Sequence, residues 1–243
     1  MELTDGIHLV ASGWLGLALT DRCDCNAYLV ADGDDAVLVD AGCGLGAERT
    51  LALIEAAGAP PVSRVLVTHA HADHAAGAAA LAAALGAEVW ASAHAAAILE
   101  AGDADAAGLT DATAAGIYPP GLAYRPTPVA HRLGDESLTV GRLRLDAVRC
   151  DGHSAGHLAF LAHHRAGLAL FSGDVVFARG RVALLSTPDS DVSALAASVE
   201  RLAALRPQLL LAGHGAPVLR DAGDHLAVAR DAFRRRALPP QLA

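Results

Sequence analysis

Short apolar runs that end abruptly at a polar residue or a glycine constrain the fold of this chain most strongly. In the first half, the apolar runs and the helical stretches that alternate with them lie at residues 7–12, 26–32, 36–42, 47–57, 63–68, 75–87 and 88–92. Strands that alternate with helices indicate βαβ units and a sheet that is at least partly parallel. We therefore expect such a sheet in the first half of the chain.

The second half of the sequence repeats this pattern. Its apolar runs and one helical stretch lie at residues 143–150, 158–163, 167–174, 192–205 and 209–214. Two halves of similar pattern predict an α/β fold of four layers, an αββα sandwich in which two mixed β-sheets are flanked by helices. We expect residues 1–243 to form a single domain. It would carry an irregular, lid-like insertion at about 101–130, rich in Pro and Gly, and a C-terminal helix and solvated tail at about 224–243.

Composition excludes several classes of partner. The formal net charge is −9 and all 18 basic residues are arginines, so we expect no basic face for a phosphate backbone and no nucleic-acid partner. The first residues lack a signal-peptide pattern and no run of about 18 apolar residues follows, which predicts a cytoplasmic protein without a membrane partner. Four cysteines are too few for a disulfide framework and are expected to be reduced, although Cys23 and Cys25 could also ligate a metal.

The stretch "LVTHAHADHAAG", residues 66–77, holds three histidines and one aspartate within six positions. On a helix, the side chains of His69 and His71 would point about 200° apart, so they could not bind the same ion. The stretch is therefore predicted to be a loop between a strand and the following helix. Ligands gather at the carboxyl ends of strands in sheets of this kind.

Other histidines and aspartates occupy equivalent places, directly after predicted strands. One such residue alone is typical of a turn or a surface, but their coincidence in four loops favours a metal site. The seven candidate ligands are His69, His71, Asp73, His74, His153, Asp174 and His214.

With these residues, the chain resembles the metallo-β-lactamase superfamily of binuclear metallohydrolases. The motif H-x-H-x-D-H is met by residues 69–74, and later motifs are met by Gly152-His153, Gly173-Asp174 and Gly213-His214-Gly215. An early Asp-x-Gly pattern places Asp40 beneath the metal loop. The resemblance implies the αββα fold with the metal site at one edge.

The resemblance also implies a role for each ligand. One ion would be bound by His69, His71 and His153; the other by Asp73, His74 and His214; and Asp174 would bridge the two. Two divalent ions are expected, zinc first, with iron or manganese as alternatives. They would hold a bridging hydroxide, which Asp73 would orient as a catalytic residue. Asp40 and His157 are expected to support the ligands from behind.

The stretch "GDVVF" resembles the GD-x-x-F of hydroxyacylglutathione hydrolases, the glyoxalase II group. The Gly-Gly-Cys-Gly run of that group does not follow Phe177, and we expect no counterpart of its helical C-terminal domain, which leaves the leaving group open. We therefore expect a hydrolase of a small-molecule ester, thioester or lactone. Asp174 argues against an antibiotic-hydrolysing role, because true β-lactamases of this fold generally lack the bridging aspartate.

Three alternative functions remain open. Acyl-homoserine lactonases are similar, but several of them place a tyrosine where this chain has Phe177. A mononuclear-iron persulfide or thiol dioxygenase would use one of His69 and His71 together with His153 and Asp174. A metal-binding protein without catalysis is the third alternative. Substrate contacts are expected from Tyr118, Tyr124 and Phe177, and the sequence leaves a homodimer open.

Overall fold

The protein is described from a computed structural model of residues 1–242, which divides into two compact units. The first unit comprises residues 1–133 and 139–142, and the second comprises residues 134–138 and those from 143 onward. Each unit has its own cluster of buried apolar side chains. Each therefore has a core that can fix the ends of its own strands.

The first unit contains a seven-stranded mixed sheet in the order β1-β2-β3-β4-β5-β6-β7. Its strands are β1 (Glu2–Thr4), β2 (Ile7–Ala11), β3 (Ala27–Asp32), β4 (Asp35–Val39), β5 (Val62–Leu66), β6 (Glu88–Ser92) and β7 (His131–Leu133). The pairs from β1 to β4 are antiparallel, and those from β4 to β7 are parallel. Parallel neighbours need a crossover, and helices supply it, as the alternating pattern predicts.

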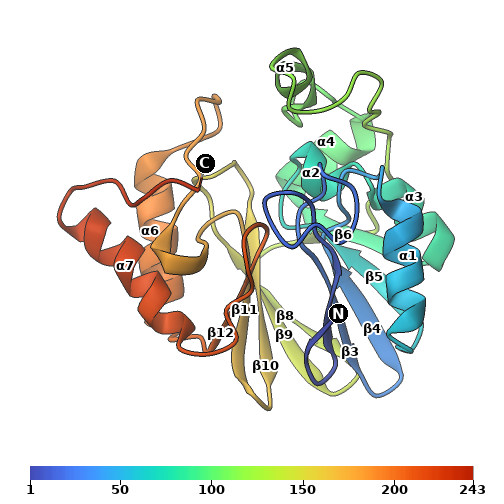
Figure 1. Ribbon diagram of the computed structural model, residues 1–243, viewed down its shortest axis with the longest axis horizontal. Helices are drawn as coiled ribbons and strands as arrows, with labels where there is room; N and C mark the ends of the chain where they lie inside the picture. Colours follow the sequence, from blue (N-terminus) through green and yellow to red (C-terminus); the bar gives the residue numbers. More distant parts are fainter. Residues whose placement is uncertain (243) are drawn as a thin grey trace. The chain divides into compact units, whose positions relative to one another are not determined.

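Five helices belong to the first unit: α1 (Ala47–Ala56), α2 (Ala72–Ala75), α3 (Ala78–Leu85), α4 (Ala93–Ala101) and α5 (Leu109–Ala114). Helix α1 packs on β2, α3 on β5 and β6, and α4 on β6 and β7 (Figure 1). Gly86 ends α3 in the left-handed conformation, with φ at 66°, which a glycine adopts without strain. Helix α4 follows β6 without a break and is missing from the sequence-based prediction.

The loop predicted for the histidine-rich stretch needs a correction. His69 and His71 do lie in a loop, but Asp73 and His74 lie in the single turn of α2. The turn forms because the backbone N–H groups of His74 and Ala75 both donate to the carbonyl of His71. The geometric argument about His69 and His71 therefore holds, while the residues after them are helical.

The second unit contains a five-stranded mixed sheet in the order β12-β11-β10-β9-β8. Its elements are β8 (Glu136–Val140), β9 (Leu143–Arg149), β10 (Leu158–His164), β11 (Gly167–Gly173), the short 3-10 helix η1 (Ala178–Gly180), α6 (Val192–Ala204), β12 (Leu209–Ala212) and α7 (Ala222–Arg234). Strands β9, β10 and β11 pair antiparallel, and β11 and β12 pair parallel. Helix α6 packs against α7, and α7 also contacts η1 (Figure 1).

The predicted fold class, α/β with two mixed sheets flanked by helices, is confirmed. The segment 101–130 is irregular over much of its length, as expected, but it also contains α5. The expected solvated tail is partly wrong, because Val182 donates a backbone hydrogen bond to Pro240 and accepts one from Leu242. Within residues 1–242, no helix combines the length and the apolar character needed to span a bilayer.

Candidate metal centre

The predicted ligands follow strand ends in both units. His69 comes after β5 in the first unit, whereas His153, Asp174 and His214 come after β9, β11 and β12 in the second. Strand ends are suitable for ligands because the sheet fixes the backbone there while the side chains leave the ladder. The expected position of these residues at strand exits is therefore found in the structure.

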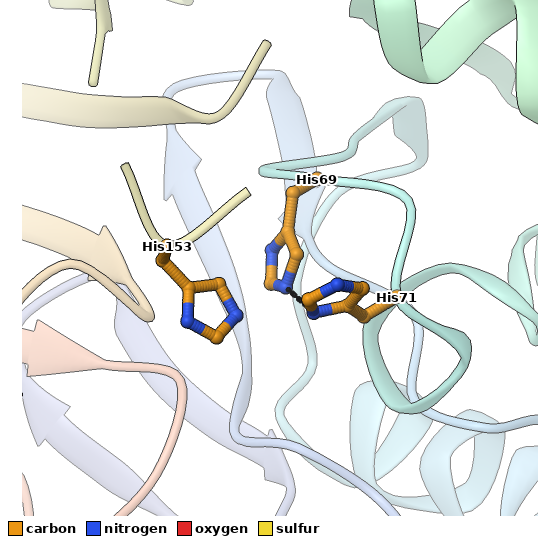
Figure 2. Close-up of side chains that lie close together, drawn as sticks. All are labelled: His69, His71 and His153. Atoms are coloured by element: carbon orange, nitrogen blue, oxygen red, sulfur yellow. Dashed lines mark hydrogen bonds between the residues drawn. The ribbon is translucent and has the colours of Figure 1, made fainter. Parts of the chain in front are cut away.

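In the first unit, His69 and His71 turn their ring nitrogens toward one another. Nε2 of His69 lies 3.0 Å from Nδ1 of His71, a contact drawn as a dashed line in Figure 2, which also shows His153 of the second unit. On the neighbouring turn, Nε2 of His74 lies 3.6 Å from Oδ2 of Asp73. Four side chains of one short stretch thus present their donor atoms as two close pairs.

Asp40 lies behind this stretch, as predicted. It follows β4 in the left-handed conformation, with φ at 62°, which aspartate tolerates better than most residues. Its carboxylate accepts hydrogen bonds from the backbone N–H and the hydroxyl of Thr68, and its Oδ2 lies 2.9 Å from Nδ1 of His74. Asp40 therefore joins the end of β5 to helix α2 and orients the His74 ring.

Three histidines have a partner on the Nδ1 side of the ring. Nδ1 of His69 is 3.0 Å from the Thr68 hydroxyl, Nδ1 of His74 is 2.9 Å from Asp40, and Nδ1 of His153 is 2.9 Å from the carbonyl of Ala183. A partner at one ring nitrogen fixes the tautomer and leaves the other nitrogen as the metal donor. In these rings that donor is Nε2.

In the second unit, Asp174 lies between two imidazoles. Its Oδ2 is 3.4 Å from Nε2 of His214 and 3.7 Å from Nε2 of His153. All three side chains are at least nine-tenths buried. One carboxylate oxygen placed between two donor nitrogens is the arrangement expected of a bridging ligand.

His157 supports Asp174 from the backbone side. Its ring is completely buried, and its Nε2 accepts a hydrogen bond of 3.1 Å from the backbone N–H of Asp174. The same residue accepts the N–H of Cys150 through its own carbonyl, at 2.7 Å. His157 thus ties the end of β11 to the start of the loop that carries His153.

The sequence between residues 20 and 214 matches the family model described as the metallo-beta-lactamase superfamily, which covers most of the chain. The chain belongs to this superfamily. Residues 69–74 and the later ligands all lie inside the matched range.

A hydroxyacylglutathione hydrolase from Jannaschia sp. is 32% identical over 152 residues, which are 62% of this chain and 47% of that protein. The chain spans about half the length of the curated relatives it matches. Two solved superfamily structures are also similar. A metallo-beta-lactamase with an HARLDQ motif from Cronobacter sakazakii shares 20% identity at a TM-score of 0.71, over 97% of this chain and 96% of that one. The BLEG-1 B3 metallo-beta-lactamase shares 26% identity at a TM-score of 0.67, over 81% and 90% of the two chains.

The ligand chemistry of this superfamily member fits divalent ions. Zinc binds imidazole nitrogen and carboxylate oxygen at about 2 Å, so two ligands of one tetrahedral ion lie roughly 3.3 Å apart. The pair of His214 and Asp174, at 3.4 Å, is close to that value, and it exceeds the 2.7–3.2 Å range typical of N–H···O hydrogen bonds. Each unit therefore contains a His/Asp cluster suited to a divalent metal.

The three predicted substrate contacts differ in their surroundings. Tyr124 is buried and its hydroxyl donates to the carbonyl of Ala70 at 2.9 Å, and Phe177 lies in the core of the second unit with 1% of its surface exposed. Their burial disfavours direct contact with a substrate. Tyr118 is partly exposed, and its hydroxyl donates to Oδ1 of Asp73 at 3.0 Å.

Thr68 was not singled out from the sequence, whereas Cys25 was considered there, with Cys23, as a possible metal ligand. Thr68 is completely buried, and its hydroxyl contacts both Asp40 and His69. The sequence feature that could have indicated it is a polar residue at the end of an apolar strand. Cys25 places its sulfur within 4.8 Å of donor atoms of Asp40 and His74. Burial raises the pKa of the Cys25 thiol to about 12, so it stays protonated at neutral pH. Within the described residues, all four cysteines are free, as expected.

Proposed function

We propose that this chain is a metal-dependent hydrolase that cleaves an ester, thioester or lactone bond in a small molecule. Membership of the superfamily and the close His/Asp pairs within each unit support a metal-dependent hydrolase. The finer statement about the bond rests on the GD-x-x-F stretch and on relatives described as hydroxyacylglutathione hydrolases.

The observation that carries the proposal is the spacing of the carboxylates from the imidazoles. The distances from Nε2 of His74 to Asp73, of His214 to Asp174, and of His153 to Asp174 are 3.6, 3.4 and 3.7 Å. These separations are too long for hydrogen bonds and close to those of two ligands on one ion. Two ion pairs of arginines have similar spacings, Arg142 with Asp32 and Arg201 with Asp135, but those arginines are exposed, whereas the three imidazoles are buried.

We propose that the two ligand sets together hold two divalent ions, with zinc as the first choice. One ion would be held by His69, His71 and His153, and the other by Asp73, His74 and His214, with Asp174 shared between them. Ions held in this way would lower the pKa of a water molecule toward neutrality and polarise the carbonyl group under attack.

The chain's own residues would prepare this chemistry. Asp40 holds Nδ1 of His74 and so fixes which nitrogen of that ring is a donor. Oδ1 of Asp73, the oxygen that does not face His74, accepts one hydrogen bond from Tyr118 and has a second lone pair. In our proposal that lone pair orients the attacking water and later carries a proton to the leaving group. His157 fixes the backbone of Asp174 and thereby the direction of its carboxylate.

The proposal is tested by measuring metal content and turnover in the same sample. Protein purified without added metal is analysed by mass spectrometry for zinc, iron and manganese, and is assayed against thioesters, lactones, β-lactams, phosphodiesters and persulfides. We expect two zinc ions per chain and turnover of thioesters or lactones. One iron per chain with oxygen consumption on persulfides would replace the hydrolase by the dioxygenase, and metal binding without turnover of any compound would overturn an enzymatic role.

A further inference from the structure

The segment 101–130 contacts the histidine-rich stretch at two places and passes close to it at a third, all within the first unit. The hydroxyl of Tyr118 donates to Asp73, and the hydroxyl of Tyr124 donates to the carbonyl of Ala70. A methyl group on Gly108 would lie 3.9 Å from the His71 ring, so the backbone there passes close to that ring. The segment is therefore packed on the ligands, and one of its contacts reaches a ligand side chain directly.

The contact of Tyr118 distinguishes the two oxygens of Asp73. Oδ1 accepts the phenol hydrogen bond at 3.0 Å, while Oδ2 lies 3.6 Å from Nε2 of His74. Asp73 lies in the one-turn helix α2, and its side chain is partly exposed. A carboxylate in such a position can rotate, and a directional donor on one oxygen restricts that rotation.

We propose that Tyr118 is a positioning residue for the second metal ion, the one assigned to Asp73, His74 and His214. Its hydroxyl would hold Oδ1 of Asp73, so that Oδ2 remains directed at that ion. The inference deepens the proposed function and rests on Asp73 being a metal ligand. It gives the insertion a role in metal binding, distinct from that of a substrate lid.

A phenol suits this role better than a charged donor. A phenol has an ordinary pKa of about 10, so the hydroxyl keeps its proton and donates at neutral pH. A cationic side chain in the same place would pair with the carboxylate and offset the charge that attracts the metal ion. The neutral phenol fixes the geometry and leaves the carboxylate anionic.

The test is the substitution Tyr118→Phe, which removes the hydroxyl and keeps the ring. Zinc affinity is measured by competition with a chromophoric chelator, starting from metal-free protein whose fold is checked by circular dichroism. We expect the affinity for the second zinc to fall about 10–100-fold, the range typical of residues that support a ligand, with the first zinc bound as in the unsubstituted protein. Turnover at saturating zinc is expected to change less than turnover at limiting zinc.

Two control variants define the outcome. Thr110→Val removes another hydroxyl of the same segment, one that donates to the carboxylate of Asp105 between two exposed residues, and should bind zinc as the unsubstituted protein does. Tyr124→Phe removes a phenol contact to the backbone of the ligand loop. If Tyr124→Phe weakens the second zinc as much as Tyr118→Phe, the segment acts by clamping the loop and the inference is wrong.

Failure of the inference can be told from failure of the proposed function. If the unsubstituted protein binds two zinc ions and Tyr118→Phe binds both equally well, only the role of Tyr118 is overturned. If the unsubstituted protein binds no second ion, the binuclear proposal and the inference resting on it are both overturned.

Discussion

The two units supply their candidate ligands in different ways. The first unit takes four from one stretch of six residues, His69 to His74, whereas the second takes its three from separate loops after β9, β11 and β12. In the first unit, the local backbone decides which side chains meet: a loop, then one helical turn. In the second unit, strand pairing decides it.

The register of β11 and β12 shows this dependence. Gly173 pairs with Ala212 in the parallel ladder, and the N–H of Gly213 donates to the carbonyl of Gly173 at 2.8 Å. Asp174 follows Gly173 directly and His214 follows Gly213, so both side chains leave the sheet at the same edge. A contiguous set can survive local damage to the sheet, whereas a set of this kind depends on the sheet being correctly paired.

The largest effect is expected from Asp174, which lies between His153 and His214 in the second unit. Asp174→Ala removes the oxygen between His153 and His214, and should lower kcat/KM by about 10³-fold or more, since a metal ion contributes several kcal/mol to transition-state stabilisation. Metal content, measured in parallel, should fall while circular dichroism stays unchanged. The exposed Asp224→Ala is the matched control in the same unit. Full activity with two metals bound in Asp174→Ala would refute the bridging role.

The next largest effect is expected from Asp40, which supports the candidate ligands at residues 69–74. Asp40→Asn keeps the size and the left-handed backbone, which asparagine also tolerates, but it directs an amide N–H at a donor, either the Thr68 hydroxyl or Nδ1 of His74. We expect zinc affinity to fall about 10–100-fold and the free energy of unfolding by about 1–3 kcal/mol. Chelator competition and thermal melting measure these changes. The exposed Asp34→Asn should change neither, and an Asp40→Asn protein with unaltered zinc affinity would contradict the role of Asp40.

A smaller effect is expected from His157, which supports Asp174 among the candidate ligands of the second unit. His157→Phe keeps a ring but leaves the backbone N–H of Asp174 without its acceptor, which should lower zinc affinity about tenfold. His157→Gln offers a new acceptor and should recover part of that loss. The comparison is made by chelator competition, with the exposed His163→Phe as the control. Equal losses in the Phe and Gln variants would show that the ring packs without orienting Asp174.

The smallest effect separates packing from substrate contact in the second unit. Phe177 lies in the core and its ring centroid is 6.1 Å from that of His214, so Phe177→Leu should lower the free energy of unfolding by about 1 kcal/mol. Denaturant titration measures this loss. If the free energy that corresponds to a rise in KM exceeds the loss of unfolding free energy, Phe177 is a substrate contact after all.

Much of the fold could be read from the sequence because its signals are local. The strands that begin at Val62 and Glu88, and the helices that begin at Ala47 and Val192, start at or within one residue of the positions that the apolar pattern and the turn residues predict. Helix α4 was missed because its alanine-rich sequence follows β6 with no glycine or proline between them. Helix α2 was missed because a single turn is too short to show a period.

Several features of the candidate site could not be predicted, because they depend on distant contacts. The carbonyl of Ala183, which orients His153, carries no signal in the sequence, since every residue has such a group. Tyr118 was expected near a substrate, and the structure instead shows its hydroxyl on a candidate ligand, 45 positions away along the chain.

The sequence by itself determined the fold class, the superfamily and the identity of the candidate ligands, since strand alternation and the H-x-H-x-D-H spacing are properties of short stretches. Only the tertiary structure decided which nitrogen of His69, His74 and His153 is left as the candidate metal donor, that Asp174 lies between two imidazoles, and that Phe177 and Tyr124 are buried. The physical reason is that hydrogen-bond partners and burial are set by residues far apart in the chain. They become defined only when the strands pair and the two cores form.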